Sequence, residues 1–365
     1  MSSDQASIFK ANLRRLLRRE WLSQRQAAEQ IGVDYKWFRR LCHQGLHRPD
    51  RRTAVGLEKV ATHFDLTVSA LWDDELPKRL EGNGGSVLIK WTGSKRLQAK
   101  QIVRRFPRRI GTYYEPFIGG GSVLYELLSS DIQCDRVKCS DICRPLIELW
   151  KVVKNEPRHL IEAYDRLWRE LQDDGAACYL KTREKFNETG NPCLFFFLLR
   201  TCRNGLVRFN QRGQFTANLH HGRSGMRPEN VKAVVEDWSQ KLREHDVRFY
   251  ARDYRRIQSI DDDLLYLDPP YRVNHRHPFY SGMIDFEMFF RWLRRQHGDY
   301  LLSLNGLRGG EDWSVDVPQD LYDEHIFVDA GKSSLAQLNG NIGGDLEDSL
   351  YVRMKSEVVG RKPEE

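Results

Sequence analysis

The chain has 365 residues, 40% of them hydrophobic and 30% charged, so it can fill a sizeable core beneath a strongly charged surface. Lys and Arg outnumber Asp and Glu by 58 to 51, and the net charge of +7 favours an anionic partner while leaving an ordinary soluble surface open. The longest apolar run, residues 194–199, is too short to cross a bilayer. Seven cysteines without a CxxC motif, and no signal pattern at the start, predict reduced thiols in the cytoplasm rather than a disulfide framework or a zinc site.

Residues 1–76 predict an all-helical domain. A second helix, capped by Ser23, should end at Gly32, and a third should begin after Asp34 as its cap. A short helix, a tight turn and another helix form the helix-turn-helix arrangement. Two shorter helices are expected around 53–64 and 69–75. The first helix is amphipathic, and its inward positions would be Ile8, Leu13, Leu16 and Leu17.

The stretch 22–72 resembles the Cro/phage-repressor-type helix-turn-helix domain, whose core positions would be Ala27, Ile31, Val33, Phe38 and Leu41. In that family the second helix of the pair enters the major groove. A helical module that binds protein is the alternative, and the basic, polar presumed groove helix favours DNA. The resemblance implies base contacts from Asp34, Tyr35, Lys36 and Arg39, and backbone contacts from Gln24, Arg40 and Arg48.

Residues 77–86, PKRLEGNGGS, predict a flexible linker because Gly, Asn and Ser dominate its end. Beyond it, strand-like runs alternate with helical stretches, so residues 87–365 predict an α/β domain. Within that domain, TYYEPFIGGGSVLYELLSS (112–130) predicts a strand, a glycine turn and a helix, which suit close approach of a ligand to the backbone. Asp141 ends the next strand and could bind a ribose hydroxyl pair.

A nicotinamide dinucleotide is the rival ligand for this turn, but the third glycine of the GxGxxG spacing is missing. Glu115 and Phe117 also precede the glycines, where plain apolar residues are usual. Upstream, Trp91 could face a cation and Lys95 a carboxylate. S-adenosylmethionine carries both groups, a sulfonium and an amino-acid carboxylate.

The run DDDLLYLDPPYRV (261–273) predicts a short buried strand, Leu264 to Leu267, that the two prolines end. Each proline fixes its own φ and restricts the residue before it, so the corner is stiff. It presents the Asp268 carboxylate, backbone carbonyls and the Tyr271 ring. A rigid turn without function is the alternative for this corner taken alone.

KWTGSK, EPFIGGGS, Asp141 and DPPY, in that order, resemble the Dam-type N6-adenine DNA methyltransferases across residues 87–353. The resemblance implies a Rossmann-like methyltransferase fold with a mixed, mostly parallel sheet, S-adenosylmethionine as cofactor and no metal. The implied catalytic residues are Asp268, Pro269, Pro270 and Tyr271. The implied cofactor-binding residues are Lys90, Trp91, Lys95, Glu115, Phe117, Gly119, Gly121, Asp141, Asp253 and Tyr254.

Residues 151–248, between Asp141 and DPPY, predict a target-recognition insertion that starts helically. VRFNQRGQFTAN (207–218) reads as a hairpin with Gly213 at the turn, rich in residues that suit base edges. A basic loop that binds only phosphates is the alternative. The stretch resembles the family's recognition hairpin, which implies DNA contacts from Arg203, Asn204, Leu206, Arg208 and Asn210, with Arg208 on a guanine.

The expected function is therefore site-specific methylation of the N6 amine of a flipped adenine in double-stranded DNA. A transcription regulator with a vestigial methyltransferase domain is one alternative, although every motif is intact. Methylation of RNA or of a protein amide is another, and such enzymes more often carry Asn in place of Asp268. A cognate nuclease or other defence proteins are the expected partners, in a prokaryotic cytosol or nucleoid or from a phage-encoded protein.

Overall fold

The computed structural model describes residues 2–19, 23–46, 53–64, 66, 68–73, 76, 88–91, 93–203, 207–220, 225–270, 284–308, 311–331 and 346–354. The chain divides into two compact units, one built mainly from residues 1–86 and the other mainly from residues 87–330 with the last strand. Each unit has its own hydrophobic core. The predicted linker, residues 77–86, lies outside the described residues.

The N-terminal unit is helical, as its amphipathic periodicity predicted. Its elements are α1 (Ser2–Arg19), α2 (Gln24–Ile31), α3 (Tyr35–Gln44), α4 (Ala54–His63) and the 3-10 helix η1 (Ser69–Trp72). Phe9 is fully buried and Ile8 only half-buried, so the inward face of α1 is displaced by one residue from the predicted one. Asn12, also buried, donates from Nδ2 to the carbonyls of Leu71 and Asp73 at 3.2 and 2.7 Å, which ties α1 to η1.

A turn of three residues joins α2 to α3. Gly32 has φ +70°, a conformation that costs a glycine little, and Asp34 caps α3 by accepting a hydrogen bond from the Trp37 amide at 2.8 Å. Trp37 points inward against α4, where a Cβ on Gly56 would lie 2.5 Å from its ring. The bulky tryptophan therefore belongs to the core of the unit rather than to the exposed face of α3.

The second unit is a mixed sheet in the order β3-β2-β1-β4-β5-β8-β7, with the short β6 beside β5. β1 pairs in parallel with β2 and β4, β2 with β3, and β4 with β5, whereas β8 runs antiparallel to β5. The strand order reverses between β1 and β4, the place where open α/β sheets bind ligands at their carboxyl edge. The strands are β1 (Arg109–Glu115), β2 (Gln133–Asp141), β3 (Arg248–Ala251), β4 (Leu264–Leu267), β5 (Asp299–Arg308), β6 (Glu311–Asp312), β7 (Glu324–Gly331) and β8 (Leu346–Arg353).

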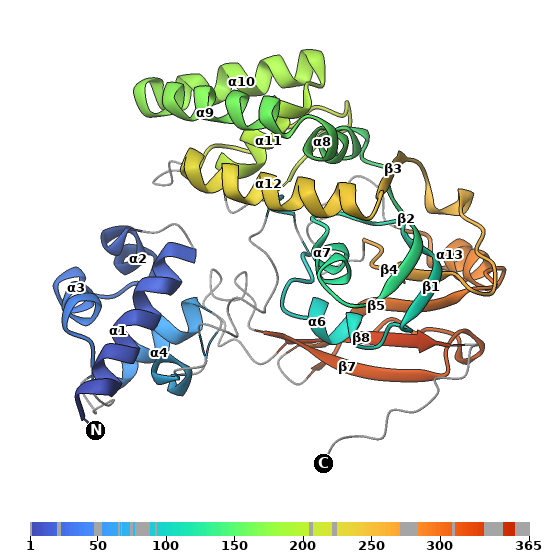
Figure 1. Ribbon diagram of the computed structural model, residues 1–365, viewed down its shortest axis with the longest axis horizontal. Helices are drawn as coiled ribbons and strands as arrows, with labels where there is room; N and C mark the ends of the chain where they lie inside the picture. The colour runs from blue at the N-terminus through green and yellow to red at the C-terminus, as the bar shows by residue number, and fades with distance from the viewer. Residues whose placement is uncertain are drawn as a thin grey trace. The chain divides into compact units, whose positions relative to one another are not determined.

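Both faces of the central strands are covered, which explains why Leu264 to Leu267 is apolar throughout. Helix α13 (Phe286–Leu293) packs Phe289 and Trp292 on the face that carries Leu265 and Leu267. On the opposite face Phe106 contacts Tyr113 and Tyr266, with ring centroids 5.7 and 6.5 Å apart. Figure 1 shows α6 (Ala99–Val103) and α7 (Ser122–Leu128) on the side of the sheet opposite to α13.

The predicted insertion is a helical layer with a hairpin between its last two helices. Its helices are α8 (Arg144–Asn155), α9 (Pro157–Asp174), α10 (Ala176–Thr189), α11 (Pro192–Thr201) and α12 (Pro228–Glu244), which Figure 1 shows stacked together. α11 is buried on every side from Cys193 to Thr201, so the apolar run at 194–199 is the centre of this layer rather than a membrane segment. No helix in the described part of the chain is long and apolar enough to span a bilayer.

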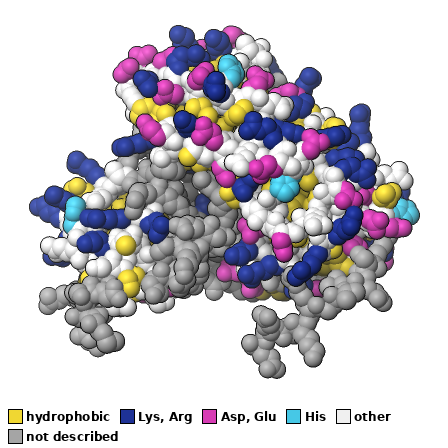
Figure 2. All heavy atoms as spheres, in the orientation of Figure 1, with side chains coloured by type: hydrophobic (Ala, Val, Ile, Leu, Met, Phe, Trp, Pro, Cys, Tyr) yellow, Lys and Arg dark blue, Asp and Glu magenta, His cyan; other side chains and the backbone are white. Residues whose placement is uncertain are grey.

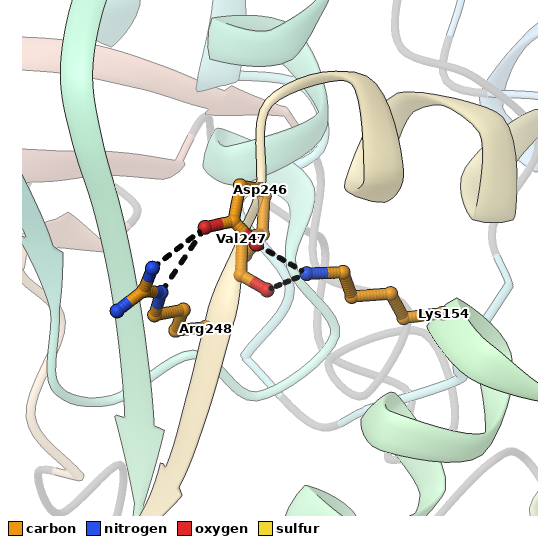
Figure 3. Close-up of polar contacts among 4 residues, drawn as sticks. All are labelled: Lys154, Asp246, Val247 and Arg248. Carbon is orange, nitrogen blue, oxygen red and sulfur yellow. Dashed lines mark hydrogen bonds and ion pairs between the residues drawn. The ribbon is translucent and has the colours of Figure 1, made fainter.

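The layer is attached to the sheet where α8, α12 and β3 meet (Figure 3). Asp246 has φ +42°, which is unusual for a residue with a side chain. Its carboxylate accepts hydrogen bonds from Lys154 at 3.0 Å and from Arg248 at 2.9 Å, and Lys154 also donates to the Val247 carbonyl at 2.9 Å. The two cations hold Asp246 in this turn and so fix the entry of the chain into β3.

The seven cysteines are free thiols, and five of them are buried, where they pack as small apolar side chains. Among the residues that the structure describes, no group of three or more His, Cys, Asp or Glu side chains could hold a metal ion.

Candidate active site

Acidic side chains from separate strands converge at the carboxyl edge of the sheet, around the reversal of strand order. Glu115 ends β1, Asp141 ends β2, and Asp268 follows β4 directly. The antiparallel β8 adds Asp348, which pairs with Asn305 of β5. The sequence predicted the first three, and Asp348 was not predicted.

Asp268 forms a close ion pair with Lys95. The Nζ atom of Lys95 lies 2.8 Å from Asp268 Oδ1, and the Lys95 side chain is 5% exposed. Burial raises the pKa of Asp268 to about 6, while the Lys95 charge lowers it and the nearby Asp348 raises it. Asp268 is therefore ionised at neutral pH and faces the site with a fixed carboxylate. Its neighbour Pro269 is buried, and Tyr271 lies outside the described residues.

Glu115 lies beneath the same edge, with a side chain almost fully buried. Burial raises the pKa of Glu115 to about 8; the hydrogen bond that it accepts from the Tyr113 hydroxyl at 2.8 Å lowers it, and the charge of Asp268 raises it. At neutral pH Glu115 is thus mainly protonated and neutral. Glu115 is thus a buried polar side chain held by Tyr113 at the end of β1, and its contact with the cofactor stays a prediction.

The glycine turn between β1 and α7 packs against tryptophan rings. Gly119 and Gly121 have φ values of +46° and +70°. A Cβ on Gly119 would lie 2.8 Å from the Trp91 ring, and one on Gly121 would lie 2.9 Å from the Trp150 ring. Side chains at these positions would therefore collide with the rings as well as strain the backbone. Trp91 stands beside the turn, in the neighbourhood that its predicted role requires.

Asp141 is tied to the same turn. Its Oδ1 accepts from the Cys143 amide at 2.9 Å and its Oδ2 from the Gly119 amide at 3.4 Å. Burial raises the pKa of Asp141 to about 6, and the backbone amides lower it. The adjacent Ile142, directly after β2, is 64% exposed, an open position for a large apolar side chain. The residue was missed at the level of sequence, where nothing distinguished it from a core isoleucine.

Other predicted cofactor residues lie close to this edge in structural roles. The rings of Phe117 and Tyr254 are in tilted contact with centroids 5.5 Å apart, and Tyr254 is buried in the core with Phe289. Asp253 caps the 3-10 helix η3 (Tyr254–Arg256) and forms an ion pair with Arg255 at 2.9 Å. Lys90 is half-buried in the segment before Lys95. The cofactor contacts of all these residues stay predictions.

A hairpin is present at 207–218, where the sequence predicted one, and its role in target recognition stays a prediction. Phe209 and Phe215 form an antiparallel bridge with rings 5.6 Å apart, and Gly213 takes φ +73° in the turn. Asn210 accepts hydrogen bonds from the Arg212 and Gln214 amides at 3.0 and 2.9 Å, so its side chain shapes the turn. Arg203 and Arg208 are exposed, whereas Asn204 and Leu206 lie outside the described residues.

In the N-terminal unit, the outer face of α3 carries exposed Tyr35, Lys36, Arg39 and Arg40, and Gln24 is half-exposed at the start of α2. Figure 2 shows Lys and Arg side chains on this part of the unit. The Arg25 guanidinium lies 5.9 Å from the Tyr35 ring, which makes the face more basic. Asp34 faces solvent but is occupied as the cap of α3, and Arg48 lies outside the described residues.

Comparisons with known proteins identify the second unit. The family model of the D12 class N6 adenine-specific DNA methyltransferases matches residues 91–287. The Type II methyltransferase M.MjaIII of Methanocaldococcus jannaschii is 34% identical over 292 residues, covering 72% of this chain and 96% of that protein. The Type II methyltransferase M1.LlaDCHI of Lactococcus lactis subsp. cremoris is 30% identical over 193 residues, covering 50% and 64%. The DNA adenine methylase of Escherichia coli K12 is 32% identical over 189 residues, also covering 50% and 64%.

The matched residues of the family model lie in the second unit, and membership implies that S-adenosylmethionine is the methyl donor. The chain belongs to the D12 class of N6 adenine-specific DNA methyltransferases.

Proposed function

We propose that this enzyme methylates the N6 amine of an adenine flipped out of double-stranded DNA, with Asp268 as the group that receives the amine. The observation that carries the proposal is the ion pair between Asp268 and Lys95, which fixes an ionised carboxylate at the edge of the sheet. A base inside a duplex cannot reach such a buried edge, so the adenine must leave the stack.

The adenine amine is a weak nucleophile because its lone pair is delocalised into the ring. The Asp268 carboxylate and the Pro269 carbonyl would each accept one N–H hydrogen bond, which favours a pyramidal nitrogen. The new N–C bond forms as the S–C bond breaks, and the surplus amine proton leaves to Asp268 or to water. The chain therefore contributes positioning and electrostatics, and no covalent intermediate with the protein is needed. Tyr271 would stack on the base.

The residues at the glycine turn fit S-adenosylmethionine, which supplies an activated methyl group on a sulfonium sulfur. The glycines let the Trp91 and Trp150 rings pack directly against the turn, which sets the shape of the proposed cofactor site. Asp141 would accept the ribose hydroxyls, and the exposed Ile142 would cover one face of the adenine ring. Trp91 would lie near the sulfonium. The remaining predicted contacts, from Lys90, Phe117, Asp253 and Tyr254, would shape the pocket walls.

The hairpin at 207–218 would read the target sequence in the major groove. Phenylalanine contacts hold it on α10 and α11, since Phe186 of α10 and Phe195 of α11 both meet the Phe215 ring edge to face. On that support the exposed Arg208 can reach a guanine edge, the commonest partner of an arginine in DNA. The hairpin turn that Asn210 organises would present its backbone to the same groove. Methylation-aware sequencing of DNA that the enzyme has modified would identify the methylation site.

The N-terminal unit, residues 1–76, would be a helix-turn-helix DNA-binding domain joined by the linker at 77–86 to the methyltransferase domain at 87–365. The exposed Tyr35, Lys36 and Arg39 on α3 support this role. Binding of a protein partner is the alternative use of the same face. A DNA substrate places the enzyme in the cytosol or nucleoid, where a cognate nuclease would be its partner.

The test measures transfer of a tritiated methyl group to duplex DNA, RNA and protein in parallel. Transfer to duplex DNA with N6-methyladenine as the product is expected. Transfer to RNA or protein alone would favour the related amide and RNA methyltransferases. A protein that binds DNA specifically and transfers no methyl group would be a regulator with a vestigial methyltransferase domain.

A further inference from the structure

Two residues with no assigned role, Gln98 and Asp348, lie behind the Lys95–Asp268 pair. Lys95 Nζ is 2.8 Å from Asp268 Oδ1 and 3.6 Å from Asp348 Oδ2. Gln98 donates from Nε2 to the same Asp348 oxygen at 2.8 Å. The ammonium therefore lies between two carboxylates, of which Asp348 is the more buried, at 9% exposed against 19% for Asp268.

The backbone holds both outer residues rigidly. Asp348 is in β8 opposite Asn305 of β5, and the register shifts just beyond Asn305. Gly306 permits the close approach of the two strands there, because a Cβ on it would lie 2.5 Å from the Glu347 carbonyl oxygen. Gln98 precedes α6, and its backbone N–H donates to the Lys95 carbonyl at 3.0 Å. The cluster thus joins the turn before α6 to strand β8.

We propose that Asp348, held by Gln98, is a positioning residue that keeps Lys95 against Asp268 and so keeps the catalytic carboxylate oriented and ionised. The inference rests on the proposed function, because it gives Asp348 a role only if Asp268 receives the adenine amine. Asp348 itself touches neither the base nor the cofactor in this assignment.

Asp348 acts on Asp268 in two opposite ways, which makes the proposal testable by the sign of a pH shift. Its own negative charge raises the pKa of Asp268 directly, whereas the Lys95 charge that it holds in place lowers that pKa. Asp268 in turn raises the pKa of Glu115 of β1 and of Tyr266 of β4, and the variants below leave both residues unchanged. Loss of a mere neighbouring charge would therefore lower the pKa of Asp268, and release of Lys95 would raise it.

The experiment uses the full chain with the substitution Asp348→Ala, S-adenosylmethionine and duplex DNA. We expect kcat to fall about tenfold, the scale of a small misplacement of the Asp268 carboxylate. The KM for each substrate should stay within about twofold of that of the native protein. The acid limb of the kcat profile should move to higher pH. Asp348→Asn keeps an acceptor for Gln98 and should recover part of the rate. Gln98→Leu should lower kcat in the same direction, and the double variant should be no slower than Asp348→Ala alone, since the residues act as one unit.

Glu324→Gln is the matched control, because Glu324 of β7 pairs at 2.7 Å with Arg105, just after α6, on the exposed side. It should leave kcat and its pH profile unchanged. An unchanged kcat in Asp348→Ala, or an acid limb that moves to lower pH, would overturn the inference. If Asp348→Ala does not fold, judged by cofactor binding, Gln98→Leu decides by the same two readouts. Retained activity in Asp268→Ala would instead contradict the proposed function itself.

Discussion

The ammonium of Lys95 lies 2.8 Å from the carboxylate of Asp268, although the two residues belong to the first and the last of the sequence motifs. Lys95 was expected to bind the carboxylate of the cofactor, and that contact stays a prediction. In the structure its charge opposes the rise in the pKa of Asp268 that burial causes. The pair explains why a buried aspartate can serve as a hydrogen-bond acceptor near neutral pH.

Replacement of Asp268 should remove methyl transfer while sparing the cofactor site. In Asp268→Ala we expect kcat to fall by at least about 10²-fold, the scale of a lost group that stabilises the transition state. The affinity for S-adenosylmethionine should stay within about threefold. Single-turnover transfer and calorimetry with the cofactor measure the two effects separately. Near-normal turnover in the variant would contradict the assignment of Asp268.

The pH dependence of kcat should follow the ionisation of Asp268. The ionised Asp268 carboxylate is a stronger acceptor for its amine N–H than the protonated acid, and burial raises the pKa of Asp268 to about 6, so activity should decline as pH falls through about 6. Lys95→Met removes the charge that lowers this pKa, so the acid limb should move to higher pH. A pH–rate profile of both proteins on one duplex checks the direction. An acid limb in the same place in both would show that another group titrates.

Glu115 makes a prediction about stability. Its folded pKa, raised to about 8, exceeds its ordinary value of 4.5, so the folded state holds a proton that the unfolded state releases between these pH values. This contribution therefore destabilises the fold progressively as pH rises from about 4.5 to about 8. Glu115→Gln has no such proton to lose and keeps an acceptor for Tyr113. Denaturant unfolding at pH 5 and pH 8 should show a smaller loss of stability in the variant than in the native protein, a difference specific to residue 115.

Asp141→Ala should weaken S-adenosylmethionine binding by roughly 1.5–3 kcal/mol, the scale of a hydrogen bond to a charged group. Part of this loss would come from the turn, because Asp141 also accepts from the amides of Gly119 and Cys143. Asp141→Asn keeps one acceptor for those amides and separates the two contributions. Calorimetry measures the affinities, and an unchanged affinity in Asp141→Ala would refute the ribose role.

The sequence predicted the parts of the site that local chemistry determines. Leu264 to Leu267 was predicted as a buried strand because two prolines follow it, and β4 has these bounds. The glycine turn and the hairpin at Gly213 were equally local. Asp348 could not be found in this way, because it reaches the site only through the antiparallel pairing of β8 with β5. The burial of Tyr254 likewise depends on α13, and the displaced face of α1 depends on how Phe9 packs within its unit.

The last prediction concerns the basic face of α3. Lys36→Ala with Arg39→Ala, in the full chain, should weaken DNA binding at low salt. The slope of log affinity against log salt concentration should become shallower by the amount that corresponds to about two phosphate contacts. The methylated site should not change, since the proposed reader is the hairpin that carries Arg208. The control is Arg166→Ala with Lys181→Ala, which removes an equal charge from the exposed surface of α9 and α10. Binding titrations at two salt concentrations and methylation-aware sequencing supply the readouts. A changed methylation site would assign target choice to the N-terminal unit, and an affinity equal to that of the control would mean that α3 binds a protein partner instead of DNA.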